Sequence, residues 1–318
     1  MILIIAFIFI FGINISNPIG CNTYDYNIIL GENGYKEKYI NSSVKDLAKK
    51  YATFSELLKD AHVELPVSGN MIPQGITYMK QKVLITAYDD KKERNSVCYV
   101  LDNDGFVINT VNLNMKSHVG SIAYDEIHNL IWLPDENGIL NAYNSMDFIF
   151  RDSVKPLLFF DNVSNGLKYF KNKKQIAFLC VKENHIFIGD FSKTKNGKVK
   201  EYKINKSSGV ISLEYIKTFT VPARTQSIEF YKKDNKEYIL ISSSYGRRNK
   251  SYIYFFEFDE NKMEYLDSEI KKVCLPPLLE QITVKSDELY LIFESGAKKY
   301  KNCKERINYI CILDLAKM

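Results

Sequence analysis

The sequence predicts an all-β fold, a five-bladed β-propeller of four-stranded antiparallel blades, and two observations carry this prediction. The first is a short phrase that occurs five times: an amide, acid or small residue, a small or polar residue, Ile or Leu, any residue, and an aromatic residue or Val. The copies begin at Gln74, Gly120, Asn165, Gln226 and Glu280. Their Ile or Leu positions stand 46, 45, 61 and 54 residues apart, a spacing typical of stacked repeat units.

The second observation is that further strand-like runs follow each copy in the same order. Second runs occur at 83–88, 130–133, 185–189, 238–242 and 288–293, and third runs at 97–101, 139–143, 199–204, 252–258 and 307–313. Weaker fourth runs occur at 106–113, 148–154, 213–221 and 265–275. All are short, rich in β-branched or aromatic residues and bounded by turn residues, which is typical of strands. Four antiparallel strands in each repeat indicate a propeller blade.

The fifth unit ends at Met318 before its fourth strand. A run resembling that strand, at 62–66, precedes the first copy of the phrase. We therefore predict that residues 61–66 pair with 307–313 and close the ring, leaving no sheet edge open.

The segment before the ring has two predicted parts. The apolar residues 1–13 have the length of a signal-peptide core, so residues 1–20 are predicted to be a signal peptide and the protein to be secreted or held in the cell envelope. Cys21, after Pro18, Ile19 and Gly20, is a candidate lipid attachment site. Residues 21–60 are predicted to carry a helix at about 43–59 with Ser43 as its N-cap. The propeller domain then spans 61–318.

Charge and cysteine use narrow the class of protein. The chain has 43 basic and 38 acidic residues, a net charge of +5, with Lys scattered through turns, which favours a solvated surface over nucleic-acid binding. We expect a monomer that contacts a membrane only through a lipid at Cys21. The six cysteines lack the C-x-x-C spacing of zinc or redox sites. A disulfide between Cys274 and Cys303 is left open.

The topology predicts where a site would lie. In a meandering blade the start of the first strand and the end of the second meet on one face, at the channel mouth. Polar residues occupy these positions in nearly every blade, which is typical of a binding site. The ligand-binding candidates are Gln74, Tyr88, Asp89, His118, Asn165, Gln226, Tyr245, Arg247, Glu280 and Glu294. The catalytic candidates are His118, Glu280 and Glu294.

Two loops add basic residues to this predicted mouth. They are residues 91–96 in the first blade and 245–251 in the fourth, and the second contains Arg247. Arg binds carboxylate or phosphate groups in bidentate fashion, so the expected ligand is an anionic small molecule or a glycan. The serine-hydrolase, zincin and nucleotide-binding motifs are absent from the sequence.

The segments 73–76 (PQGI), 117–125 (SHVGSIAYD), 244–247 (SYGR) and 293–295 (FES) resemble those of uncharacterised secreted bacterial β-propeller proteins, over residues 61–315. That resemblance implies no activity. More distantly the chain is similar to the gluconolactonase and strictosidine synthase-like propeller group. This second resemblance implies a divalent cation such as Ca²⁺ at the mouth, held by Glu280, Asn165 and one of Asp89, Asp135 or Asp190. It also implies six blades, where the repeats number five.

Two hypotheses from different classes follow. One is an exported, non-catalytic binding or interaction propeller. The alternative is a metal- or carboxylate-dependent, hydrolase- or lactonase-like enzyme at the same mouth. Propellers host both, so the fold does not choose between them.

Overall fold

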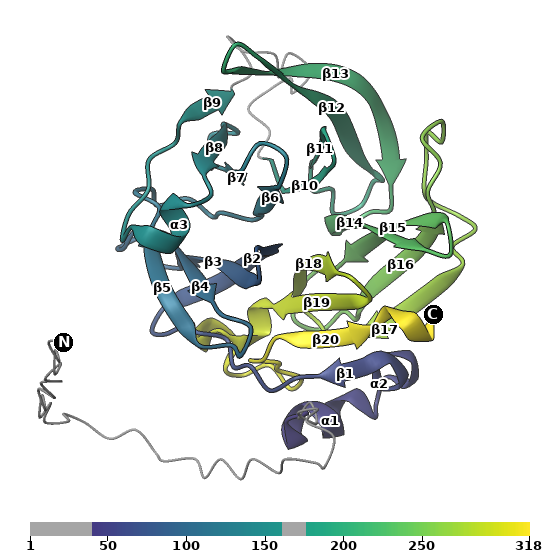
Figure 1. Ribbon diagram of the computed structural model, residues 1–318. Helices are drawn as coiled ribbons and strands as arrows, with labels where there is room; N and C mark the ends of the chain where they lie inside the picture. The colour runs from purple at the N-terminus through teal and green to yellow at the C-terminus, as the bar shows by residue number, and fades with distance from the viewer. Residues whose placement is uncertain (1–39, 161–175) are drawn as a thin grey trace, which may run out of the picture. The chain divides into compact units, whose positions relative to one another are not determined.

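The computed structural model describes residues 40–160 and 176–318, which form five four-stranded antiparallel sheets. Figure 1 shows these sheets arranged around a common axis, so the predicted five-bladed propeller is confirmed. Blade 1 consists of β2 (Met71–Met79), β3 (Lys82–Asp89), β4 (Val97–Leu101) and β5 (Val107–Asn112). Blade 2 consists of β6 (Ala123–Asp125), β7 (Leu130–Pro134), β8 (Leu140–Asn144) and β9 (Leu158–Phe160).

The remaining blades follow the same order from the axis outward. Blade 3 consists of β10 (Phe178–Lys182), β11 (His185–Gly189), β12 (Gly197–Ser207) and β13 (Val210–Val221). Blade 4 consists of β14 (Thr225–Lys233), β15 (Lys236–Ser243), β16 (Ser251–Glu257) and β17 (Lys271–Leu275). Blade 5 consists of β18 (Leu279–Lys285), β19 (Glu288–Phe293), β20 (Cys311–Asp314) and, outermost, β1 (Leu58–Asp60).

The ring closes as the sequence predicts, although the closing strand begins earlier than expected. In β1, Leu58 lies opposite Leu313 of β20. Pairing continues beyond a bulge, since Ile310 N donates to Val63 O at 2.9 Å and Leu65 N donates to Asn308 O at 2.8 Å. The segment that closes blade 5 therefore runs from Leu58 to Leu65 rather than over 61–66.

The single helix expected at about 43–59 is two short helices, α1 (Ser42–Ala48) and α2 (Ala52–Leu57). Asn41 rather than Ser43 is the N-cap of α1, because its side chain accepts from Ser43 N. The break between the helices lets both contribute to one core: Val44 and Phe54 are buried with residues of blades 4 and 5. The predicted signal peptide and Cys21 lie outside the described residues.

Two strand predictions are wrong. The first strand of blade 3 is β10, at Phe178–Lys182, whereas the copy of the phrase at 165–169 lies outside the described residues. In blade 2 the outer strand is β9, because residues 147–150 form the short helix α3 (Asp147–Phe150), which buries Phe148. The second error comes from an apolar run that fits the strand pattern but forms a helical turn.

Polar side chains tie the inner strands of the blades together around the axis. Ser121 of blade 2 bonds the backbone of Leu179 in blade 3, and Ser227 Oγ accepts from Ile282 N of blade 5 at 3.1 Å. Gln281 Oε1 accepts from both Ile76 N and Ile122 N, at 3.1 and 3.0 Å, so this side chain joins blade 5 to blades 1 and 2. The residue before the buried Ile of the repeated phrase therefore satisfies backbone donors of neighbouring blades.

Gly75 holds the equivalent position in blade 1, and space explains the glycine. A Cβ there would lie 2.6 Å from Thr86 Oγ1 and 3.0 Å from Gln281 Oε1. The missing side chain is what allows Gln281 to reach across.

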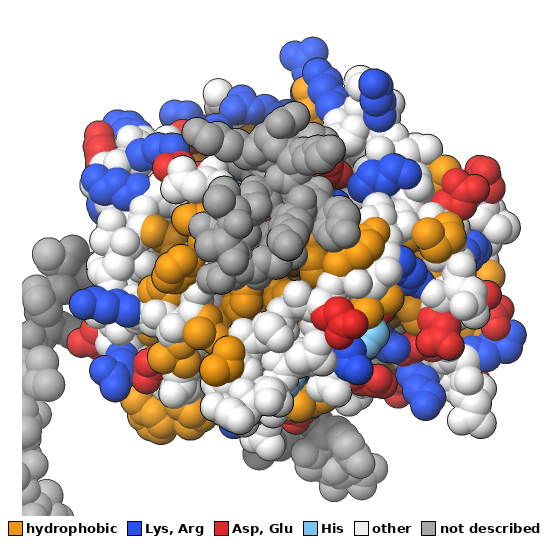
Figure 2. All heavy atoms as spheres, turned by 90° about the horizontal axis from the view of Figure 1, so that it is seen from above, with side chains coloured by type: hydrophobic (Ala, Val, Ile, Leu, Met, Phe, Trp, Pro, Cys, Tyr) orange, Lys and Arg blue, Asp and Glu red, His pale blue; other side chains and the backbone are white. Residues whose placement is uncertain are grey.

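The outer surface carries mixed charge. On the face seen in Figure 2, Lys and Arg side chains are scattered among acidic ones, and hydrophobic side chains gather beside the grey atoms.

Cys274 and Cys303 are both free, so the structure does not join them by a disulfide. Over the described ranges, the search for a helix long and apolar enough to cross a membrane finds none.

Candidate functional site

Bulges in three inner strands direct polar side chains to the channel mouth. The pairing of the first two strands shifts between Pro73 and Ile76 in blade 1, between Thr225 and Ser227 in blade 4, and between Leu279 and Ile282 in blade 5. Each bulge contains the residue two positions before the buried Ile, namely Gln74, Gln226 and Glu280. In a regular strand neighbouring side chains point to opposite faces, and an inserted residue re-aims a side chain. The three bulges therefore gather an amide, an amide and a carboxyl group at one end of the channel.

Blades 2 and 3 present small residues at the same position. In blade 3 the pairing of β10 with β11 is regular, and the residue two positions before the buried Leu179 is Ala177. In blade 2 the equivalent residue is Gly120. A cavity of about 950 Å³ opens at the mouth, lined by Gly120, Ala177 and Ile176 on one side and by Gln74, Gln226, Glu280 and Glu294 on the other. The space lies where two of the five blades lack a long side chain.

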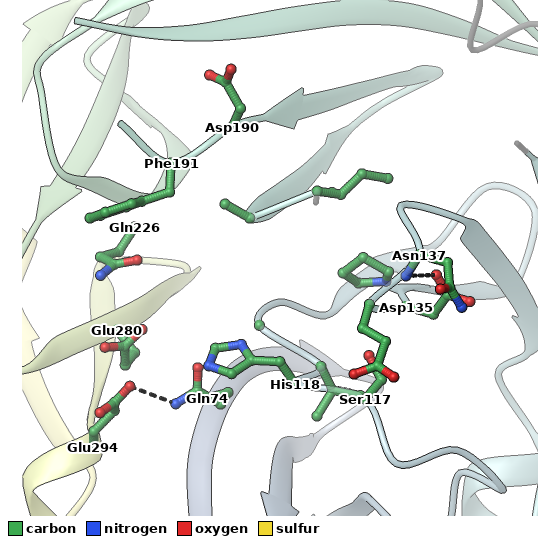
Figure 3. A pocket seen from close by; sticks show the side chains of 16 residues that line it. Gln74, Ser117, His118, Asp135, Asn137, Asp190, Phe191, Gln226, Glu280 and Glu294 are labelled. Carbon is green, nitrogen blue, oxygen red and sulfur yellow. Dashed lines mark hydrogen bonds between the residues drawn. The ribbon is translucent and has the colours of Figure 1, made fainter. Parts of the chain in front are cut away.

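The polar wall contains a pair of carboxyl groups (Figure 3). Glu280 and Glu294 lie within hydrogen-bonding range of each other and are 7% and 8% exposed. Burial, together with this contact, raises the pKa of Glu280 well above its ordinary value. Glu294 accepts from Gln74 Nε2 at 2.9 Å and from the Tyr300 hydroxyl. Burial therefore favours the protonated form of Glu280, while Glu294 is held by two donors.

The same wall contains unpartnered polar atoms. Gln74 Nε2 faces two acceptors, Glu294 and Pro73 O, which fixes the orientation of the amide. Gln74 Oε1 is consequently buried without a hydrogen-bond partner. Ser117 Oγ is also buried without one, and both residues line the cavity. Buried polar atoms are normally paired, so these two are suited to a ligand or an ordered water.

His118 is a neutral ring on the cavity surface. Its ring lies 4.5 Å from that of Tyr88, centroid to centroid, and its side chain is exposed within the cavity. The surrounding protein removes part of the hydration of the imidazole and lowers its pKa, more than the negative charge of Glu294 raises it. His118 Nδ1 would lie 3.2 Å from a Cβ at Gly120, so the ring occupies space that the glycine leaves free.

Several predicted acidic candidates hold loops. Burial would raise the pKa of Asp89, but backbone donors at Arg94 and Lys91 outweigh it and the pKa is lowered. Asp89 does not line the cavity. Asp135 Oδ1 accepts from Asn137 N and Ile139 N, and Asp190 Oδ1 accepts from Lys198 N. Asp135 and Asp190 line the cavity rim, and both also shape turns.

A smaller pocket of about 270 Å³ lies on the other side of the acid pair and shares Gln226, Glu280 and Glu294 with the cavity. Its other residues include Tyr245, Arg247, Leu278 and Tyr300. The guanidinium carbon of Arg247 lies 5.0 Å from the centroid of the Tyr300 ring. Burial and the neighbouring Glu294 raise the pKa of Tyr300, so its hydroxyl remains a donor.

The structure brings together most of the predicted site. Gln74, His118, Gln226, Glu280 and Glu294 line the cavity, Tyr245 and Arg247 line the smaller pocket, and Tyr88 supports His118. Gln74, Glu280 and Glu294 are buried in the wall of the mouth.

The predicted cation set cannot be assembled from the described residues. Asn165 lies outside them, and Glu280 is paired with Glu294. Figure 3 shows Asp190 apart from Glu280, with Phe191 and Gln226 between them. Within the described ranges no group of three or more His, Cys, Asp or Glu residues is placed to hold a metal ion.

Sequence reasoning missed Tyr300, Ser117 and Phe191. Tyr300 belongs to the short helix η2 (Lys298–Tyr300), which follows η1 (Glu294–Gly296) in the connection between β19 and β20. This connection has no counterpart in the repeat. The one sequence feature that points to Tyr300 is that it lies a few residues after Phe293-Glu294-Ser295 in the chain.

The loops that enter the mouth are conformationally unusual. Val119, Arg224 and Leu278 precede the inner strands of blades 2, 4 and 5 and have φ values of 43°, 66° and 69°. A left-handed backbone at residues other than Gly costs on the order of 1–3 kcal/mol and tends to cluster at functional sites. Positive φ values also occur in the turns at the opposite end of the blades, at Lys80, Gln81 and Asp234 among others, so backbone conformation does not distinguish the mouth.

Comparison with known proteins finds only distant structural likenesses. No family model matches the chain, and no curated protein matches it. Among solved structures, the chain is similar to a Bombyx mori GH32 β-fructofuranosidase, a mutant in complex with sucrose, at 13% identity over 85% of this chain and 66% of that one, with a TM-score of 0.49. It is similar to the RRP9 WD40 repeats at 9% identity over 80% and 99%, with a TM-score of 0.45. It is also similar to a chain of a nidogen–laminin complex at 11% identity over 78% of each chain, with a TM-score of 0.40. Likenesses this distant carry no inference about ligand or activity.

Proposed function

We propose that the protein is an exported binding propeller whose mouth cavity takes the neutral, hydroxyl-rich part of a small molecule or glycan. The observation that carries the proposal is the set of polar groups in the cavity wall, with Gln74 Oε1 and Ser117 Oγ buried and unpartnered. Hydroxyl groups both donate and accept, so they match a wall that offers acceptors and the proton on Glu280. A cavity of about 950 Å³ has room for a sugar or a short glycan.

The lining argues for a neutral group in this cavity rather than an anion. Asp135, Glu136, Asp190, Glu280 and Glu294 line it, and no Lys or Arg does among the described lining residues. An anion would have to lose its hydration beside these carboxyl groups with no opposite charge to offset the cost.

The test is calorimetric titration of the purified full-length protein with a panel of neutral mono- and oligosaccharides. We expect at least one to bind, and Glu280→Leu to weaken it by at least about tenfold, because Leu offers neither the donor nor the acceptor of the protonated carboxyl group. Glu257→Leu, a change of the same type on the exposed face of β16, is the matched control. If no saccharide binds, or both variants weaken binding equally, the proposal is wrong.

Export is part of the proposal and has its own test. The apolar residues 1–13 support a signal peptide, and Cys21 supports a lipid anchor as the alternative to free secretion. N-terminal sequencing of protein from the medium and the cell envelope should find a mature chain that begins between about residues 16 and 23. Intact Met1 in the cytosol would contradict export.

A second candidate function is hydrolysis, and the acid pair favours it. Two carboxyl groups sharing a proton can activate water, as in aspartic proteases. Glycosidases need their carboxyl groups at least about 5 Å apart, so this hydrogen-bonded pair does not fit their geometry. Product release from a panel of lactones, esters and peptides, abolished by Glu294→Gln, would favour the enzyme.

A further inference from the structure

We propose that the small pocket holding Arg247 is a carboxylate subsite, so that the ligand of the mouth is an acidic sugar with its ring in the large cavity and its carboxylate beside Arg247. This inference rests on the proposed function and names the ligand class within it.

The side chain of Arg247 is available to a ligand. Its guanidinium lies over the Tyr300 ring at 5.0 Å, and within the described part of the chain it makes no hydrogen bond or ion pair. It shares the pocket with Glu280 and Glu294, yet neither lies within the 4.0 Å of a salt bridge. Arg306, by contrast, donates to Ser295 O and Gly296 O. The five N–H donors of Arg247 therefore face the pocket or solvent, and Tyr300 supports the plane of the group.

The loop that carries Arg247 is held in one conformation. Asn249 Nδ2 donates to Tyr245 O at 2.7 Å, and Gly246 supplies the left-handed turn, with φ of 74°. The Tyr245 ring is flanked by Lys193 Nζ at 4.7 Å and by the Arg224 guanidinium at 5.6 Å. A fixed loop allows Arg247 to bind without ordering a flexible segment first.

The charges around the pocket fit a group with a single negative charge. Glu294 is already bound by Gln74 and Tyr300, and burial favours the protonated form of Glu280. A carboxylate in the pocket would face the planar guanidinium, which it can engage in bidentate fashion, and the acidic hydrogen of Glu280. A phosphate would bring up to two charges to a place where one guanidinium lines the pocket and Glu294 lies near. We therefore favour a carboxylate over a phosphate.

The two pockets are joined in a way that suits one ligand. Gln226, Glu280 and Glu294 line both. The volumes are unequal, about 950 Å³ and about 270 Å³, which matches a ring or chain of rings beside one small charged group. A sugar that carries a carboxylate on its ring spans such an arrangement across Glu280.

The experiment titrates the full-length protein with matched pairs: galactose with galacturonate, glucose with glucuronate, and galacturonate with its methyl ester. Glucose 6-phosphate tests the other anion. The variants are Arg247→Gln and Arg248→Gln. The Arg248→Gln variant removes the same charge at the next residue, whose side chain does not line the pocket.

We expect the wild-type protein to bind an acidic sugar at least about tenfold more tightly than its neutral partner, as one charge-assisted bidentate contact would give. Arg247→Gln should reduce that preference to within about threefold, and Arg248→Gln should keep it. Equal binding of acidic and neutral sugars by the wild type, survival of the preference in Arg247→Gln, its loss in Arg248→Gln, or a stronger preference for glucose 6-phosphate would each overturn the subsite. Neutral sugars that bind without any acidic preference leave the proposed function standing, whereas absence of binding by every sugar removes both.

Discussion

The inner strands of blades 1, 4 and 5 differ from those of blades 2 and 3 at a single repeat position. The first three carry Gln74, Gln226 and Glu280 in a bulge, and the other two carry Gly120 and Ala177. A ring of five identical blades would present five equal side chains and fill or clear its mouth evenly. The difference shows that the site comes from breaking the repeat, with three blades supplying the polar wall and two supplying the space.

At the next position of each strand, directly before the buried Ile or Leu, the residues hold the blades together. Ser121, Ser227 and Gln281 bind backbone groups of other blades, and Gly75 makes room for Gln281. Blade 3 has Phe178 here, which packs into the core between blades 3 and 4. Neighbouring residues of one phrase therefore divide between the candidate site and the contacts that hold the blades together, and the following predictions test that division.

The largest effect is expected from Gln281→Leu. The change leaves Ile76 N, Ile122 N and Ile122 O without their buried partner, and each such loss costs about 1–3 kcal/mol. We expect a loss of about 3 kcal/mol or more in the free energy of unfolding, measured by urea denaturation. Gln226→Leu is the control, because this side chain makes one bond, to Ser244 O at 3.3 Å, and should cost less than about 1 kcal/mol. Equal losses would mean that the two positions do not differ in role.

The sequence predicted the ring because its signals are local and repeated. Alternating apolar residues, turn residues and the spacing of Ile76, Ile122, Ile228 and Ile282 are independent of how blades meet. The phrase misplaced the first strand of blade 3, since the strand at Phe178–Lys182 departs from the consensus. A strand without the bulge has no reason to keep the polar residue.

The site was predicted less completely than the ring. Gln74, Gln226, Glu280 and Glu294 follow from topology, which brings strand ends to one mouth. The burial of Gln74, Glu280 and Glu294 does not follow from it, and the Tyr300 hydroxyl that binds Glu294 comes from a connection outside the repeat. The bulges are also invisible in the sequence, since an extra residue in one strand is defined only by its partner.

The second prediction concerns Glu229 of β14, which directly follows Ile228, whereas Gln226 lies two residues before Ile228. Glu229 Oε1 accepts from Cys180 Sγ at 3.2 Å and from its neighbour Phe230 N at 3.1 Å. Burial raises its pKa from 4.5 to about 7, so the folded protein holds this proton to higher pH than the unfolded chain does. The stability that this proton contributes is fully present below pH 4.5 and is lost as the pH rises to about 7.

The corresponding loss of unfolding free energy has an upper bound of about 3 kcal/mol. The loss is smaller than this bound because the Glu229 side chain is partly accessible to solvent. Glu229→Gln should reduce the fall in unfolding free energy between pH 4.5 and 7, measured by urea denaturation at several pH values. Glu257→Gln, on the exposed face of β16, should leave the fall unchanged. A wild-type profile in the Glu229 variant would show that Glu229 does not hold this proton.

The third prediction places in blade 3 the long amide side chain that blades 1 and 4 carry at this position. Ala177→Gln places a long amide at the cavity floor, where Ala177 and Ile176 leave space. We expect the affinity for the saccharide that the wild type binds best to fall about tenfold, equal to about 1.4 kcal/mol, while the urea midpoint changes little. Ser212→Gln on β13, away from the mouth, is the control and should leave affinity unchanged. Unchanged affinity in Ala177→Gln would mean that the ligand does not use the space over blade 3.

The smallest effect is expected from Gly120→Ala, which tests whether His118 depends on the glycine. The new methyl group would lie 3.1 Å from Ala177 O and 3.2 Å from His118 Nδ1, so the imidazole must move by a few tenths of an ångström. Because a side chain on the cavity surface can yield, we expect less than about 1 kcal/mol of destabilisation. Affinity should fall only a few-fold, since the ring keeps its contact with Tyr88. Gly209→Ala, where a Cβ meets no atom within 4 Å but φ is 82°, separates backbone strain from crowding: it should cost stability and leave affinity unchanged. If Gly120→Ala binds as tightly as the wild type, the position of His118 does not matter to the ligand, and the contribution of blade 2 to the site is its empty space alone.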